Sequence, residues 1–119
     1  MITRDELDTF FSETRSLFAE GRAKWSIDDP CRWSYFFVDS SSEKLGPVGQ
    51  HLETLGYEVD GLLEPDPASA DQLYYLRADR IEFHTVDSLL ARNAELHAIA
   101  AKYGVSDYDG MDVGAADGP

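Results

Sequence analysis

Residues 84–114 read HTVDSLLARNAELHAIAAKYGVSDYDGMDVG, and this stretch decides which fold the chain can adopt. Its first part spaces apolar or small side chains as one helical stripe does, at Val86, Leu89, Leu90, Leu96, Ala100 and Tyr103. Thr85 can cap the start of this helix, and Gly104 can supply the left-handed residue that commonly closes one. A short strand should follow, with Met111 and Val113 on one face and Asp112 on the other. Because the helix must bury its stripe, the stretch predicts a helix lying on a sheet.

Three earlier segments carry strand patterns. Residues 33–38 (WSYFFV) are mostly aromatic or β-branched, which is typical of a strand covered on both faces, so we place this strand in the middle of the sheet. Apolar and acidic residues alternate over residues 58–64, as in an edge strand with one wet face. Residues 73–78 form the next expected strand, and residues 81–84 can extend it past a kink. With the strand after Gly104, the sheet has four strands.

Two further helices complete the pattern. Thr3 and Glu6 form a capping box at the start of the first helix, which ends near Gly21. The second runs to about Leu55, and we expect its regular turns only from Pro47, because proline fits the first helical position and not the interior. The element order predicts an α+β fold: a ferredoxin-like βαββαβ sandwich with an additional N-terminal helix and an antiparallel four-stranded sheet.

Length and hydropathy indicate one domain outside the membrane. With 119 residues, 43% of them hydrophobic, the chain can form a single core, so we expect one domain over residues 1–114 and a short flexible tail over residues 115–119. No apolar run approaches the roughly 20 residues that cross a bilayer. The first residues lack the apolar region of a secretory signal, and a cytoplasmic location is therefore expected.

The balance of charge excludes one class of partner and favours another. The chain carries 23 acidic residues and 10 basic ones, for a net charge of −13. Proteins bind nucleic acid by neutralising phosphates with lysine and arginine, so this chain has the wrong sign for direct nucleic-acid binding. Such an acidic surface favours a basic protein partner, or serves only solubility.

Strand directions in the predicted fold gather acidic loops at one end of the sheet. The loop after the first strand, the loop between the second and third strands, and the start of the fourth strand all lie there. We expect these loops to dock a basic partner through Asp39, Glu43, Glu64, Asp66, Asp71, Asp107 and Asp109. The alternative is that the loops are acidic only because they are solvated.

The sequence offers no motif for catalysis, metal or cofactor binding. His51, His84 and His97 lack the spacing of zinc ligands. Serines 40–42 lack the G-x-S-x-G turn that exposes a nucleophile, and they fit helix capping better. No glycine-rich phosphate loop is present. We therefore expect no catalytic residue, no metal site and no cofactor.

Aromatic strand residues leave two alternatives open. A small ferredoxin-like enzyme could have a pocket on the sheet lined by Tyr35, Phe37, Tyr75 and His84. The rings of Tyr35, Phe37 and Tyr75 could instead be exposed to stack on RNA bases, but few basic residues accompany them. We expect these rings to be buried, under a first helix that carries Phe10, Phe11 and Phe18.

Three short motifs together resemble a known family. Residues 55–59 (LGYEV), 101–105 (AKYGV) and 108–110 (YDG) resemble the regulator of ribonuclease activity B (RraB) family, over about residues 3–113. Met111 stands where the family favours tryptophan. The resemblance implies a ferredoxin-like domain that binds ribonuclease E, an endoribonuclease, and lowers its cleavage of RNA without touching the RNA or doing chemistry. The alternative within the same fold is an acidic module for another basic protein, similar to an immunity protein of a nuclease toxin.

Overall fold

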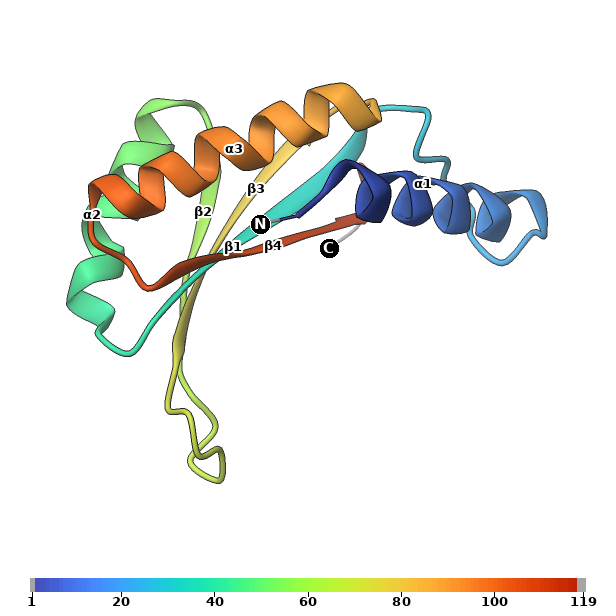
Figure 1. The fold of residues 1–119 in the computed structure, drawn as a ribbon. Coiled ribbons are helices and arrows are strands. Elements are labelled where there is room, and N and C mark those ends of the chain that lie inside the picture. The colour runs from blue at the N-terminus through green and yellow to red at the C-terminus, as the bar shows by residue number, and fades with distance from the viewer. Residues whose placement is uncertain (1, 118–119) are drawn as a thin grey trace.

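The aromatic run becomes β1 (Cys31–Asp39), a central strand in the computed structural model, which describes residues 2–117. Within these residues the element order is α1 (Arg4–Ala19), β1, α2 (Ser42–Thr54), β2 (Glu58–Leu63), β3 (Tyr74–Glu82), α3 (Val86–Lys102) and β4 (Asp107–Gly114) (Figure 1). Every strand pair is antiparallel, and the strand order is β2-β3-β1-β4. The predicted ferredoxin-like βαββαβ arrangement with an additional N-terminal helix is confirmed, as are the central place of β1 and the edge position of β2.

The core lies between one face of the sheet and the three helices. Trp33, Tyr35 and Phe37 of β1 are fully buried on this face. Phe11 of α1 stacks on Trp33, with ring centroids 6.2 Å apart. The helices bury apolar side chains in the same core, among them Leu7, Leu45, Leu52, Leu89 and Leu96. All three helices therefore share one side of the sheet (Figure 1).

The second face of the sheet carries no helix within residues 2–117 (Figure 1). Ser34 and Val38 of β1 are nevertheless buried there, under the side chains of neighbouring strands. Both faces of β1 are largely buried, as its aromatic and β-branched sequence predicts. The physical cause differs on the two faces, since helices cover the first, whereas on the second the long side chains of Arg32 and Arg77 lie around Ser34.

Helix ends follow the expected capping chemistry in α1 and α3. The Thr3 side chain accepts a hydrogen bond from the backbone N–H of Glu6, and the Glu6 carboxylate accepts one from the backbone N–H of Thr3. Thr85 caps α3 in the same way, with Ser88 as its partner. Gly104 follows α3 with a φ of 68°, the left-handed conformation predicted for it.

The start of α2 was predicted wrongly. The helix begins at Ser42, and Pro47 lies inside it. Leu45 and Val48 on either side of this proline are fully buried, so core packing holds the turn that proline weakens. Ser41 is the N-cap residue but makes no capping hydrogen bond through its side chain, which corrects the expectation that a serine hydroxyl caps this helix.

Two smaller differences concern β3 and the C-terminus. β3 runs without a break to Glu82, so the predicted kink before residue 81 is absent from this described strand. The predicted tail over residues 115–119 lies partly outside the described residues, which end at residue 117. None of the helices within residues 2–117 combines the length and the apolarity that a membrane span requires.

Candidate protein-binding surface

Strand register places the predicted acidic stretches at one end of the sheet. Val38 lies opposite Asp107, and Asp39 lies opposite Tyr74. β2 ends beside the start of β3, and the loop that joins them projects beyond the rest of the sheet (Figure 1). We call the exposed carboxylates of these stretches the acidic end; it comprises Glu43, Glu64, Asp66, Asp71, Asp107 and Asp109.

Asp39, the seventh predicted residue, is not part of this exposed surface. Its exposed fraction is 2%. The carboxylate accepts hydrogen bonds from the backbone N–H of Ser41 at 2.7 Å, and from the backbone N–H and hydroxyl of Ser106 at 2.8 and 3.0 Å. The bond from Ser41 and those from Ser106 lower the pKa of Asp39, although burial opposes this shift. Asp39 therefore ties the start of α2 to the start of β4.

The loop between β2 and β3 brings three of the predicted carboxylates together. Glu64, Asp66 and Asp71 line one hollow of about 190 Å³, with Tyr75 at its side. The Asp66 carboxylate accepts the backbone N–H of Ala68 at 2.9 Å, a local turn typical of aspartate. Within residues 2–117, no ion pair involves Glu64, Asp66 or Asp71, so the negative charge of the loop is uncompensated.

A second group of carboxylates forms where β4 begins. Asp107 and Asp109 line one hollow with Glu6 of α1. Burial and the negative charge of Asp107 raise the pKa of Asp109. The nearest partner is His97, whose Nδ1 lies 4.0 Å from a carboxylate oxygen of Asp107. The sequence did not point to Glu6, because the strand order alone does not say where an additional N-terminal helix packs.

Ion pairing distinguishes the acidic end from the carboxylates that hold the sheet together, although exposed carboxylates elsewhere among the described residues, such as Asp8 and Glu13, are also unpaired. Within residues 2–117, none of its six carboxylates forms an ion pair with arginine or lysine. Every arginine of the chain has a carboxylate partner elsewhere. These pairs include Arg4–Asp87, Arg15–Asp28, Arg22–Glu20, Arg32–Asp79, Arg77–Asp79, Arg80–Glu82 and Arg92–Glu82.

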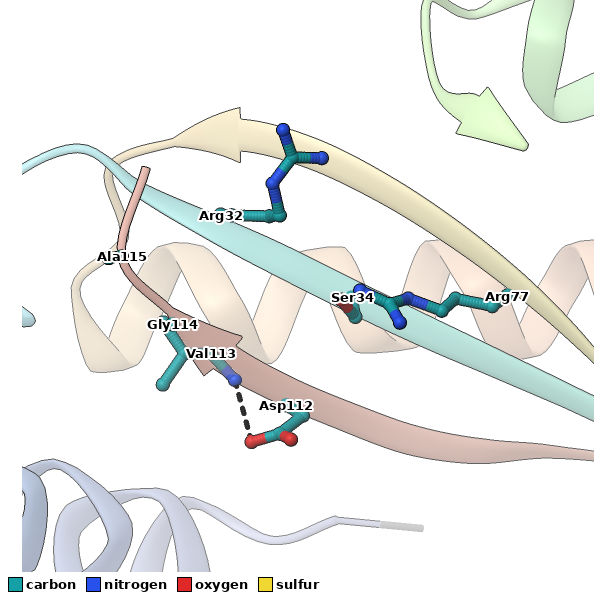
Figure 2. Close-up of a pocket in the computed structure, with 7 residues that line it drawn as sticks. All are labelled: Arg32, Ser34, Arg77, Asp112, Val113, Gly114 and Ala115. Carbon is teal, nitrogen blue, oxygen red and sulfur yellow. Dashed lines mark hydrogen bonds between the residues drawn. The ribbon is translucent and has the colours of Figure 1, made fainter. Parts of the chain in front are cut away.

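One example of this pairing lies on the face of the sheet that carries no helix within residues 2–117. A hollow of about 310 Å³ lies there, lined partly by Arg32, Ser34 and Arg77 (Figure 2). Both arginines bind the buried Asp79 carboxylate: Arg77 donates to both of its oxygens, at 3.0 and 3.1 Å, and Arg32 contacts one of them at 3.3 Å. Figure 2 shows that the side chains of Arg32 and Arg77 extend in different directions, with the Arg77 guanidinium beside Ser34. The two arginines are thus neutralised within the chain, and the hollow has no cation free for an anionic ligand.

A buried network around Glu82 is the other paired cluster. The Glu82 carboxylate accepts hydrogen bonds from the Tyr35 hydroxyl at 2.5 Å and from Arg92 at 2.9 Å, and it lies 2.8 Å from His84 Nε2. Burial opposes ionisation, but the contacts with His84, Tyr35 and Arg92 outweigh it and lower the pKa of Glu82 to about 2. No sequence pattern predicts this network, because Tyr35 is distant from the other members in the chain and the four residues follow no known motif.

The aromatic residues do not form the pocket that the enzyme alternative required. Tyr35 and Phe37 are 0% exposed and pack against Tyr57 and Tyr108. Tyr75 lines the hollow of the β2–β3 loop instead. The buried rings of Tyr35 and Phe37 are also inaccessible to RNA bases. The expected cover by the three phenylalanines of α1 is not found. Phe10 and Phe11 pack on Trp33 instead, and Phe18 is 47% exposed.

The fold and its charge distribution define an acidic α+β domain whose negative charge is uncompensated at one end of the sheet. The sequence matches the family model of Regulator of ribonuclease activity B over residues 13–113, which is most of the chain. The chain therefore belongs to the RraB family, as its short motifs predicted. This family is regulatory and not catalytic. No curated protein matches the sequence significantly.

Proposed function

We propose that this protein binds an endoribonuclease of the ribonuclease E type and lowers its cleavage of RNA, with no chemistry of its own. The observation that carries the proposal is the acidic end, whose six exposed carboxylates have no arginine or lysine partner within residues 2–117, in a chain of the RraB family. Carboxylates that are structural in this protein, such as Asp79 and Glu82, are paired. The unpaired ones are therefore available to another molecule.

The physical basis is charge complementarity. An enzyme that binds RNA needs basic groups that neutralise phosphates. Carboxylates gathered at one end of an acidic protein attract the same basic groups over long range and speed encounter with them. Occupation of such groups by the acidic end would remove contacts on which the nuclease or its assembly depends.

A cleavage assay tests the proposal. Purified protein is mixed with ribonuclease E and a 5′-monophosphorylated RNA, and the initial cleavage rate is measured as the protein concentration rises. We expect the rate to fall and then to reach a plateau as the enzyme saturates. Unchanged cleavage at saturating protein would contradict the proposal and would leave the acidic end as a site for a different basic protein.

A filter-binding assay with the same RNA and without enzyme separates two routes to inhibition. We expect no retention of the RNA by the protein alone, because the chain carries a net charge of −13. Tight and salt-sensitive retention would mean that inhibition arises from capture of the substrate. That outcome would overturn direct binding to the enzyme.

A further inference from the structure

We infer that the free edge of β2 accepts an extended basic segment of the partner protein as an additional strand of the sheet. Among the strands within residues 2–117, β2 is an edge strand and pairs with β3 alone. An edge strand offers unpaired backbone N–H and C=O groups, and many proteins recognise peptides by adding a strand at such an edge. The identity of the protein that supplies the segment rests on the proposed function.

β2 has the side chains that strand addition requires. Leu62 and Leu63 are 41% and 54% exposed. Leu62 lies opposite the buried Leu76, whereas Leu63 lies opposite Tyr75 and thus on the other face. An apolar side chain therefore stands on each face of the edge, where it can pair with alternate residues of an added strand. The irregular register is confined to the first half of β2, between Val59 and Gly61.

The charge beside this edge selects a basic segment. Glu64, Asp66 and Asp71 follow directly in the β2–β3 loop, and none has an arginine or lysine partner within residues 2–117. Opposite charges on neighbouring strands stabilise their pairing, and like charges oppose it. A second copy of this chain would bring the same carboxylates against each other. The occupant is therefore a segment that alternates basic and apolar residues, supplied by another protein.

The other edge of the sheet is less suited to an added strand. Gly110 in β4 is buried, and a Cβ atom at this position would lie 3.7 Å from Ile2. Met111 and Val113 are partly buried against the core. Among the described residues of β4, none is an exposed large hydrophobic residue comparable with Leu62 or Leu63. The two edges thus differ in both access and apolar surface.

A peptide probe tests the mode of binding. The probe is a ten-residue peptide in which arginine and valine alternate, and the control replaces two valines with proline, which cannot donate a backbone hydrogen bond. We follow backbone amide signals and hydrogen exchange of the full chain by NMR. Slower exchange and shifted signals in residues 58–64, with binding at least about tenfold weaker for the proline peptide, are expected. Equal binding of both peptides, or the largest changes in residues 107–114, would overturn the inference.

Matched variants test the apolar contribution. Replacing Leu62 and Leu63 with threonine keeps the preference for strand conformation and removes the exposed apolar surface. We expect binding of the probe to weaken about tenfold, because one leucine loses its contact with a valine and the other, on the opposite face, loses its contact with the aliphatic part of an arginine side chain. The control replaces Ile81 and Phe83, each 52% exposed and outside β2, with threonine and should leave binding unchanged. An equal loss in both variants would argue against a site at β2.

The cleavage assay distinguishes a failure of this inference from a failure of the proposed function. If the native chain lowers cleavage and the Leu62 and Leu63 double variant lowers it equally well, strand addition at β2 is overturned and the proposed function stands. If the native chain leaves cleavage unchanged while the probe still protects residues 58–64, the proposed function fails. The edge of β2 then remains a site for a basic strand of another protein.

Discussion

Two groups of carboxylates in this protein differ in whether they contact a cationic side chain. At the acidic end, six exposed carboxylates stand without arginine or lysine partners within residues 2–117. Elsewhere on the sheet, Asp79 is buried, the Glu82 side chain is only 13% exposed, and each contacts at least two cationic side chains. Every arginine is paired with a carboxylate outside the acidic end, so the carboxylates of this end have no arginine partner in the described part of the chain. The comparison separates charges that hold the fold from charges that are free to act on a partner.

The largest expected effect comes from Glu82→Ala. This change would leave Arg92 and the Tyr35 hydroxyl without their buried acceptor. Removal of one partner from a buried ion pair commonly costs about 3–5 kcal/mol of unfolding free energy. Urea unfolding should show a loss of this size, whereas Glu64→Ala at the acidic end should change stability by less than about 0.5 kcal/mol. Comparable losses for the two variants would contradict the division between paired and free carboxylates.

The dependence of the unfolding free energy on pH should show the same difference between paired and unpaired carboxylates. The ordinary pKa of Glu82 is 4.5 and its folded value is about 2, so its contribution is fully present above pH 4.5 and is lost as pH falls toward 2. At about 1.4 kcal/mol per pKa unit, the loss is about 3 kcal/mol. Glu82→Gln should remove this part of the acid dependence in thermal unfolding. An unchanged pH profile in the variant would show that Glu82 is not the group responsible.

Asp39 is the one predicted site residue that the structure buries, and its substitution tests whether it stabilises the fold or binds a partner. Asp39→Ala removes the acceptor of Ser41 and Ser106, and we expect a loss of about 1–3 kcal/mol because two backbone donors lose their partner. Asp39→Asn, which keeps one carbonyl oxygen, should lose less. The control Glu43→Ala changes a nearby exposed carboxylate and should be almost neutral. If Asp39→Ala instead left stability intact and weakened partner binding, Asp39 would belong to the docking surface.

Asp109 gives the smallest expected effect, with the opposite sign. Its pKa is raised by burial and by the charge of Asp107, so its ionisation opposes folding at neutral pH. Asp109→Asn should therefore raise the melting temperature slightly. Asp28→Asn is the matched control in a paired position, where Arg15 lowers the pKa, and it should lower the melting temperature slightly. Changes of the same sign in both variants would contradict the assignment.

Local patterns in the sequence predicted most of the fold. The capping boxes at Thr3 and Thr85, the closing Gly104 and the aromatic β1 all depend on neighbouring residues, and short-range physics decides them. The start of α2 escaped prediction because tertiary packing around Leu45 and Val48 overrides the local preference of Pro47. The position of α1 also depends on tertiary contacts, in this case with Trp33 and α3.

The candidate surface could be predicted only in outline. Strand directions fix which loops meet at one end of the sheet, so the acidic loops were found from topology. Sequence cannot show whether a carboxylate turns inward, and Asp39 was therefore expected among the exposed carboxylates, whereas the structure buries it. The pairing of every arginine away from this end also requires coordinates, since Arg32 of β1 reaches Asp79 of β3, where Arg77 of the same strand also binds.

The most direct test measures the dissociation constant of the complex with ribonuclease E at low and high salt. One variant changes Glu64, Asp66, Asp107 and Asp109 to lysine, and a matched variant changes Asp8, Glu13, Asp29 and Glu53, exposed carboxylates away from the acidic end, with the same gain in charge. Salt screens exposed charges beyond about 8–10 Å. The account predicts strong weakening at low salt, and little at high salt, for the first variant only. Equal weakening by both variants, or at both salt concentrations, would contradict it.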